Sequence, residues 1–190
     1  MMIAYKAFEP DLSCTSGGNR FQYDEKEWNE EPEANCAKNG FHCASNPLDC
    51  LTYYPDWASA VYYMVLAAGD INEDGYDSKI SCTRMKLLKK LTLKEFVSEG
   101  IMYMCDHPQL KTNGMVQEDT GEAHQHFTIV RGKKPVAKGR IGSILGFAQE
   151  APNSREIVQA GMLIVDGKNV LPDTWYTLDG KIAERLVAEL

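Results

Sequence analysis

Residues 60–69, AVYYMVLAAG, form the most apolar run of the chain, and residues 78–88, SKISCTRMKLL, follow after a short acidic stretch. The first segment is rich in aromatic and β-branched side chains, a composition typical of a central strand. The acidic residues 70–77 would form the connection. The sequence therefore predicts a long hairpin or two adjacent strands over residues 61–88.

Two other segments carry helix-start signals. In NPLDCLTYYPDW, Asn46 suits a helix cap, Pro47 suits the first helical position, and Pro55 would end the helix after about two turns. In TLKEFVSEGIMYMCDH, Thr92 and Glu95 form a capping box ahead of an apolar stripe. We therefore expect two helices in the N-terminal part.

The C-terminal part has a different sequence pattern. Residues 107–126 are polar and lack a period, which predicts a loop or linker. Short β runs follow, and the Asp-Gly pairs at 166–167 and 179–180 are typical of hairpin turns. The expected fold class is α+β: an N-terminal mixed sheet with two helices over residues 1–106, followed by a β-rich domain with hairpins over 127–190.

The 190-residue chain has a formal net charge of −7, and the acidic excess lies in residues 1–78. Acidic surface repels phosphates, which argues against nucleic-acid binding. No window approaches ~18 consecutive apolar residues, so no contact with a membrane is predicted. The N-terminus lacks the basic flank and apolar run of a signal peptide. We therefore expect a cytoplasmic protein.

Six cysteines without a secretion signal indicate reduced thiols rather than a disulfide framework. Cys36, Cys43 and Cys50 recur at regular spacing, with His42 beside the middle one. Structural zinc sites pair their ligands more closely in sequence, and the chain has no such pair. The sequence therefore predicts no zinc site and no cofactor.

The chain contains the phrases YKAF, GFHCASNPLDCLTYY, DGYDSKIS and VDGKNVLPDTWYTLDGK. Together they resemble an uncharacterised family of phage- and prophage-associated proteins, over residues 3 to about 105 and about 138 to 182. Members often carry a repetitive stretch that resembles a stacked β-repeat. The short, basic segment TIVRGKKPVAKGRIGSILGFAQ occupies that place, so at most one or two coils are expected. The resemblance implies a setting in the host cytosol and gives no reaction.

The acidic stretch DINEDG resembles the first half of a calcium-binding loop, with Asp70, Asn72 and Asp74 at ligand positions. The final position holds Ser81 instead of the bidentate glutamate that such loops need. We interpret the stretch as an acidic turn and keep the three residues as a weak calcium candidate.

No catalytic residues are predicted, because the chain lacks the common nucleophile and phosphate-binding motifs. His42 and Cys43 are sequence neighbours, so on a strand they point to opposite faces. One enzymatic alternative remains. GFHCASNPLDCLTYY looks like the NAD-binding part of ADP-ribosyltransferase-like folds, which implies a cleft around Tyr5, Lys6 and residues 40–54.

Aromatic side chains crowd residues 53–63, beside the acidic stretch. Tyrosine and tryptophan are favoured at binding surfaces because they bury much area with few rotatable bonds. We therefore predict a partner-binding surface within residues 46–78. Its contact residues would be Tyr53, Tyr54, Trp57, Asp70, Asp74 and Asp77.

A basic run holds Arg131, Lys133, Lys134, Lys138 and Arg140. Lysines often lie on the edge strand of a sheet, where their charge disfavours pairing with another chain. Alternatively, these cations form a phosphate-binding patch, or they meet the acidic part of another copy and give a homo-oligomer.

These observations favour a phage- or prophage-derived protein that acts by protein binding, as an inhibitor of a host or defence protein. Two alternatives stay open. One is an ADP-ribosyltransferase-like enzyme that uses NAD. The other is a structural or assembly component of a phage particle.

Overall fold

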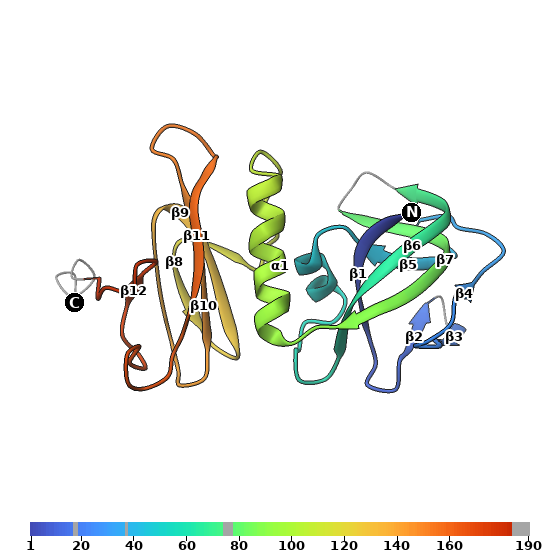
Figure 1. The fold of residues 1–190 in the computed structure, drawn as a ribbon, viewed down its shortest axis with the longest axis horizontal. Coiled ribbons are helices and arrows are strands. Elements are labelled where there is room, and N and C mark those ends of the chain that lie inside the picture. The colour runs from blue at the N-terminus through green and yellow to red at the C-terminus, as the bar shows by residue number, and fades with distance from the viewer. Residues whose placement is uncertain (17–18, 37, 74–77, 184–190) are drawn as a thin grey trace. The chain divides into compact units, whose positions relative to one another are not determined.

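The computed structural model of the chain describes residues 1–16, 19–36, 38–73 and 78–183. The chain divides into two compact units, Met1–Phe96 and Val97–Leu190. The elements, labelled in Figure 1, are β1 (Met2–Phe8), β2 (Ser13–Ser16), β3 (Asn19–Gln22), β4 (Asn29–Glu30), β5 (Phe41–Ala44), the 3₁₀ helix η1 (Pro47–Thr52), β6 (Val61–Glu73), β7 (Lys79–Lys90), α1 (Leu93–Asp106), β8 (Val116–Ala123), β9 (Phe127–Gly139), β10 (Ile144–Glu150), β11 (Ile157–Ile164) and β12 (Tyr176–Thr177).

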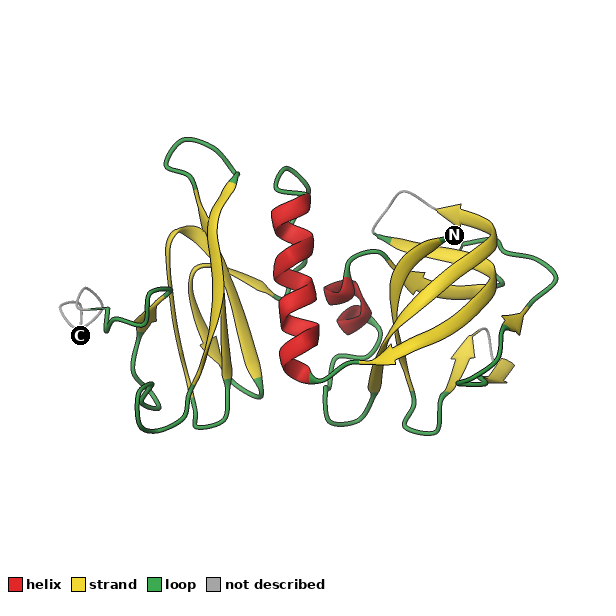
Figure 2. Cartoon of the chain, in the orientation of Figure 1, coloured by secondary structure: helices red, strands yellow, loops and turns green. Residues whose placement is uncertain are grey.

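The predicted α+β class is wrong, because the protein is mostly β, with 49% strand and 11% helix (Figure 2). The first expected helix is only the short η1, although its start was identified correctly. Asn46 caps it by accepting a hydrogen bond from the Leu48 N–H, and proline occupies its first turn. Capping residues fix where a helix begins, but its length depends on packing that sequence signals do not describe.

Four strands of the N-terminal unit close into a barrel. The pairing runs β5–β1–β6–β7, and β7 returns to pair with β5. All these pairs are antiparallel, and β4 adds to β7 outside the ring. The predicted pairing of residues 61–88 is confirmed, since β6 and β7 run side by side over nearly their whole lengths. Closure leaves these four strands without a free edge between them.

The barrel interior follows from strand alternation. On β1, Ala4 and Phe8 belong to the apolar core, with Met2 packed against it. Residues that alternate along a strand share a face, so Lys6 lies on this inward face too. The rings of Phe8 and Tyr23 pack edge-on at a centroid distance of 4.9 Å. One lysine therefore stands among aromatic and aliphatic side chains.

The C-terminal unit contains parallel strands joined by very short links. Val116 of β8 pairs with Ile129 of β9, and Phe127 pairs with Ile144 of β10, all in parallel. A flat crossover between parallel strands needs a dozen or more residues, far more than these links provide. Within β8, Asp119 has a φ of +56°, and the register against β9 shifts there. Successive parallel strands with such short links wind as a short coil.

Helix α1 begins with the predicted capping box. The Thr92 N–H and hydroxyl donate to the Glu95 carboxylate, and the Glu95 N–H donates to Thr92 Oγ1. Further along, Val97 and Ile101 approach Gly146 of β10 so closely that a Cβ there would lie 3.1–3.2 Å from their side chains. The small residue on β10 therefore allows this close packing.

The segment 107–126, expected to be a loop or linker, contains β8. Its strand residues are largely polar, so no alternation of apolar side chains marked them in the sequence. Pairing with β9 makes this segment a strand. Among the described residues, no helix combines the length and apolar character needed to cross a bilayer.

Candidate functional site

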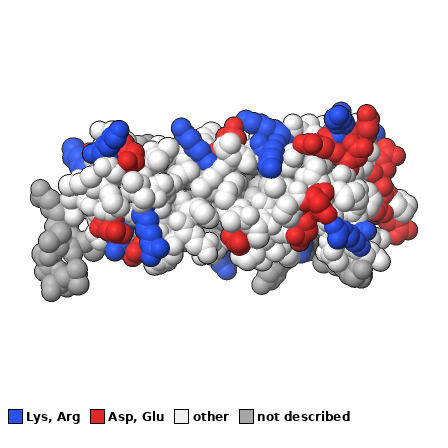
Figure 3. Space-filling view, turned by 90° about the horizontal axis from the view of Figure 1, so that it is seen from below, with Lys and Arg blue, Asp and Glu red and all other residues white. Residues whose placement is uncertain are grey.

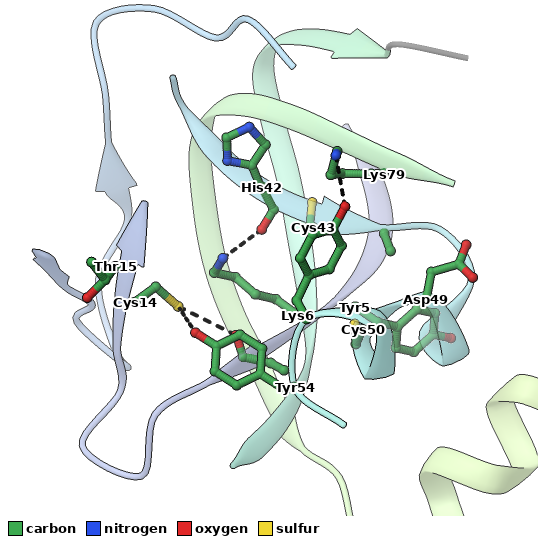
Figure 4. A pocket seen from close by; sticks show the side chains of 13 residues that line it. Tyr5, Lys6, Cys14, Thr15, His42, Cys43, Asp49, Cys50, Tyr54 and Lys79 are labelled. Atoms are coloured by element: carbon green, nitrogen blue, oxygen red, sulfur yellow. Dashed lines mark hydrogen bonds between the residues drawn. The ribbon is translucent and has the colours of Figure 1, made fainter. Parts of the chain in front are cut away.

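A pocket of about 300 Å³ opens beside η1, at one side of the barrel (Figure 4). The strands β1 and β5 form its wall, η1 and the residues after it form a second side, and β2 contributes a third. Its volume lies at the lower end of the range for small-ligand sites. The lining residues are Tyr5, Lys6, Ala7, Cys14, Thr15, His42, Cys43, Ala44, Asp49, Cys50, Tyr53, Tyr54 and Lys79.

Lys6 is the most unusual lining residue, because it is only 8% exposed. Its Nζ donates a hydrogen bond of 2.7 Å to the backbone oxygen of His42. It also lies 5.3 Å from the ring centroids of both Phe8 and Tyr23. Removing an ammonium from water costs several kcal/mol, and this hydrogen bond and the two cation–π contacts offset part of that cost.

Two opposing effects set the charge of Lys6. Burial lowers the pKa of its amine, but electrostatic interactions with Tyr23, Cys14 and Cys43 outweigh burial, so the pKa is raised above its usual value. Burial in turn raises the pKa of the Tyr23 phenol to about 12. The Tyr23 phenol is therefore neutral near neutral pH, and the Lys6 amine lies beside it.

Two tyrosines stand at the rim of the pocket. Tyr53 is 54% exposed, and Lys79 Nζ donates to its hydroxyl at 2.9 Å while lying 5.3 Å from the ring centroid. The Tyr54 hydroxyl donates to Cys14 Sγ at 3.5 Å, which ties the η1 side to β2. Burial raises the pKa of Tyr54. Both rings are thus held in place by polar contacts, with one face of Tyr53 open to solvent.

The cysteines of the pocket are free thiols. Burial raises the pKa of Cys50 to about 12. The hydrogen bond with Cys82, together with burial, raises the pKa of Cys43. Because the thiolate is the nucleophile, neither cysteine is activated for covalent chemistry near neutral pH.

The structure divides the six predicted partner-binding residues among different places. Tyr53 and Tyr54 line the pocket, whereas Trp57 stacks on Tyr62 at 4.4 Å between ring centroids and contacts Phe96. Asp70 lies on β6, exposed, with its N–H donated to Thr83 Oγ1. Asp74 and Asp77 lie outside the described residues. The structure therefore brings together two of the six.

The calcium candidate is likewise split. Asp70 and Asn72 belong to β6, and Asn72 Oδ1 accepts a hydrogen bond from the Cys36 N–H at 3.0 Å. Ser81 is buried on β7 and pairs with Asn72. Over the described ranges, no group of three His, Cys, Asp or Glu side chains is placed to hold a metal ion.

The basic run does not form one surface. Arg131 is 4% exposed and donates to Glu150 Oε1 at 2.7 Å and to the backbone oxygens of Pro108 and Arg155. Lys138 pairs with Glu122 at 3.2 Å and lies over the Trp175 ring. Three cations of the run remain exposed: Lys133, Lys134 and Arg140.

Sequence reasoning missed the role of three pocket residues, Cys14, Thr15 and Lys79, because they come from segments far from the predicted cleft residues in the chain. Lys6 did carry a usable signal. It interrupts the alternating apolar positions of β1, where a charged residue is out of place unless something compensates it.

Residues 2–99 match the family model described as a domain of unknown function (DUF7666). All lining residues of the pocket fall inside this stretch. Comparison with curated proteins and with solved structures finds no match to the chain. The resemblance to an uncharacterised family is thus confirmed at that level, and the matched segment is the one that holds the pocket.

Proposed function

The chain belongs to the DUF7666 family of domains of unknown function, and from the pocket in this family segment we propose that it works by binding a partner protein. The partner inserts a side chain or chain end into the pocket, where it contacts the rim residues Tyr53 and Tyr54. The observation that carries this proposal is the half-exposed Tyr53 ring, held by Lys79 at the mouth of a cavity of about 300 Å³. An ordered aromatic ring beside a cavity loses little conformational entropy on binding.

The biological setting comes from the sequence resemblance. In our proposal the protein belongs to a phage or prophage, and its partner is a host or defence protein. Binding would inhibit this partner. On the face seen in Figure 3, acidic side chains gather over the N-terminal unit. Such a field would speed the approach of a partner with a basic surface around its docking segment.

The binding proposal can be tested with matched variants. Tyr53→Ala removes the rim ring, and Leu88→Ala removes an exposed apolar side chain of the same unit that does not line the pocket. A partner captured from host lysate and then purified should bind Tyr53→Ala about 30-fold more weakly, the effect of losing roughly 2 kcal/mol at a hot spot. Leu88→Ala should bind normally. Equal binding by the wild type, Tyr53→Ala and Leu88→Ala would disprove the proposal.

A second candidate function is supported by the location of the pocket. It is lined by Tyr5, Lys6 and residues within 40–54, where a NAD-using transferase would have its cleft. Thermal unfolding with and without NAD distinguishes the two. A dinucleotide present at 100 times its dissociation constant stabilises the folded state by about 2.7 kcal/mol. Absence of any shift at millimolar NAD would leave protein binding as the proposal.

A further inference from the structure

The charge balance inside the barrel is incomplete. Lys6 is an ammonium ion on the inward face of β1, surrounded by the core rings of Phe8 and Tyr23. Among the described residues, no carboxylate forms an ion pair with it. The acid of the pocket, Asp49, accepts hydrogen bonds from the hydroxyl and N–H of Ser78. Buried charges in proteins are ordinarily paired, so this unpaired cation needs an explanation.

The ammonium group also retains hydrogen-bonding capacity. A lysine has three N–H donors. The His42 backbone oxygen accepts one, and the Tyr23 ring centroid lies 5.3 Å from Nζ. Donor capacity remains beyond the bond to His42, and Lys6 lines the pocket of about 300 Å³. A second cation, Lys79, stands at the rim of the same pocket.

We infer that the pocket binds an anionic oxygen group, a carboxylate or a phosphate, with Lys6 as the deep cation and Lys79 as the outer one. This inference rests on the proposed binding function and names the chemistry of the group that the partner inserts. An anion in the pocket would neutralise Lys6 in a low-dielectric environment, where such a pair is stronger than in water. Tyr54 and Cys14, which are hydrogen-bonded to each other, would also line the site.

The acidic character of residues 1–78 does not conflict with this assignment. Exposed charges are screened over ~8–10 Å at physiological salt, whereas the contact with Lys6 is buried and short-ranged. The surrounding acids would weaken binding of free, highly charged anions. They would favour an anionic group presented singly on a longer ligand, such as one residue of a protein.

The test uses the full chain in a buffer of neutral zwitterions, titrated separately with sodium acetate, inorganic phosphate and sodium chloride at matched ionic strength. Binding is followed by isothermal calorimetry and by chemical-shift changes of the amides on β1 and β5. Acetate or phosphate should produce saturable changes around Lys6 and His42, and chloride should not. A response to acetate alone identifies a carboxylate ligand, and a response to phosphate alone identifies a phosphoryl group.

Lys6→Met should reduce the anion affinity at least 10-fold, whereas Lys90→Met, on β7 outside the pocket, should leave it unchanged. If Lys6→Met does not fold, Lys79→Met must weaken binding, so that the chemical shifts of the same amides saturate at a higher anion concentration. Undiminished anion binding in both pocket variants, or equal responses to all three salts, overturns the inference. Loss of partner binding in Tyr53→Ala with no anion effect would leave the proposed function standing alone, so the two failures are separable.

Discussion

The Asp49 carboxylate accepts a hydrogen bond of 2.5 Å from the Ser78 hydroxyl, and Asn46 in turn donates its N–H to the Ser78 oxygen at 3.0 Å. Ser78, just ahead of β7, thereby forms hydrogen bonds with both the cap and the first turn of η1. The wall of the pocket thus depends on a contact between segments that are about thirty positions apart in the chain.

Ser78→Ala should loosen η1 and destabilise the protein by roughly 1.5–3 kcal/mol, the usual contribution of a hydrogen bond to a charged group. Urea denaturation measures the free energy of unfolding. Ser59→Ala, whose hydroxyl donates to the Asp56 backbone at an exposed position, serves as the control and should change stability by less than about 0.5 kcal/mol. Equal stabilities for the two variants would contradict this account of the pocket wall.

Gly69→Ala should be costly for two reasons. Gly69 has φ of +73°, which adds about 1–2 kcal/mol for any residue with a Cβ. The new Cβ would also lie 2.0 Å from Thr83 Oγ1, the atom that accepts the Asp70 N–H. Gly114→Ala, where nothing lies within 4 Å, provides the matched control. We expect a marked drop in melting temperature for the first variant and none for the second.

Glu95 gives a prediction about pH. Its hydrogen bond from Lys89, aided by those from Thr92, lowers its pKa from 4.5 to about 2. A carboxyl group with a lowered pKa stabilises the folded state above its unfolded pKa, and this contribution is lost as the pH falls toward 2. Stability should therefore decline from about pH 4.5 to 2 more steeply in the wild type than in Glu95→Gln, which keeps a capping side chain without the charge. Parallel pH profiles for the two proteins would refute the assignment.

The six thiols should differ in reactivity. Cys43, Cys50 and Cys82 are buried, whereas Cys14, Cys36 and Cys105 are partly exposed. Limited alkylation of the native protein should label the partly exposed group first, and mass spectrometry of the peptides identifies the sites. Rapid labelling of Cys82, which is buried in the barrel core and does not line the pocket, would contradict this order of reactivity.

Local sequence signals predict the helix starts of this protein correctly, whereas the sequence does not predict which distant strands pair. The capping box of Thr92 and Glu95 and the cap at Asn46 were predictable because a few neighbouring residues determine them. Barrel closure was not, since it requires β7 to pair with both β5 and β6, and alternation alone does not specify partners. The sequence predicts a loop or linker at the polar β8, because the strand character of these residues depends on pairing with β9.

The candidate site shows the same division. The aromatic cluster drew attention to Tyr53 and Tyr54, which do line a pocket, but Trp57 stacks on Tyr62 instead. Composition could identify binding-prone side chains, yet their grouping is set by how η1 lies against β1. Lys79 joins Tyr53 through a contact that spans 26 positions of sequence, which no local pattern encodes.

Arg131 should prove structural. Its guanidinium is buried and bonded to Glu150 Oε1 and to the Pro108 and Arg155 backbone oxygens. Arg131→Met removes three hydrogen bonds and leaves Glu150 with the more distant Arg155, 3.8 Å away, as its remaining cation. Breaking a buried pair in this way costs about 3–5 kcal/mol, so the C-terminal unit should unfold at much lower denaturant concentration.

The exposed Lys134 provides the control for this experiment, because Lys134→Met alters the same basic run without touching the pair. It should change stability by less than about 0.5 kcal/mol. The double variant Arg131→Met with Glu150→Gln should recover part of the loss, since it removes a largely buried carboxylate whose remaining cation is 3.8 Å away. If Arg131→Met is as stable as Lys134→Met, then the buried pair of Arg131 and Glu150 contributes little to the stability of the C-terminal unit.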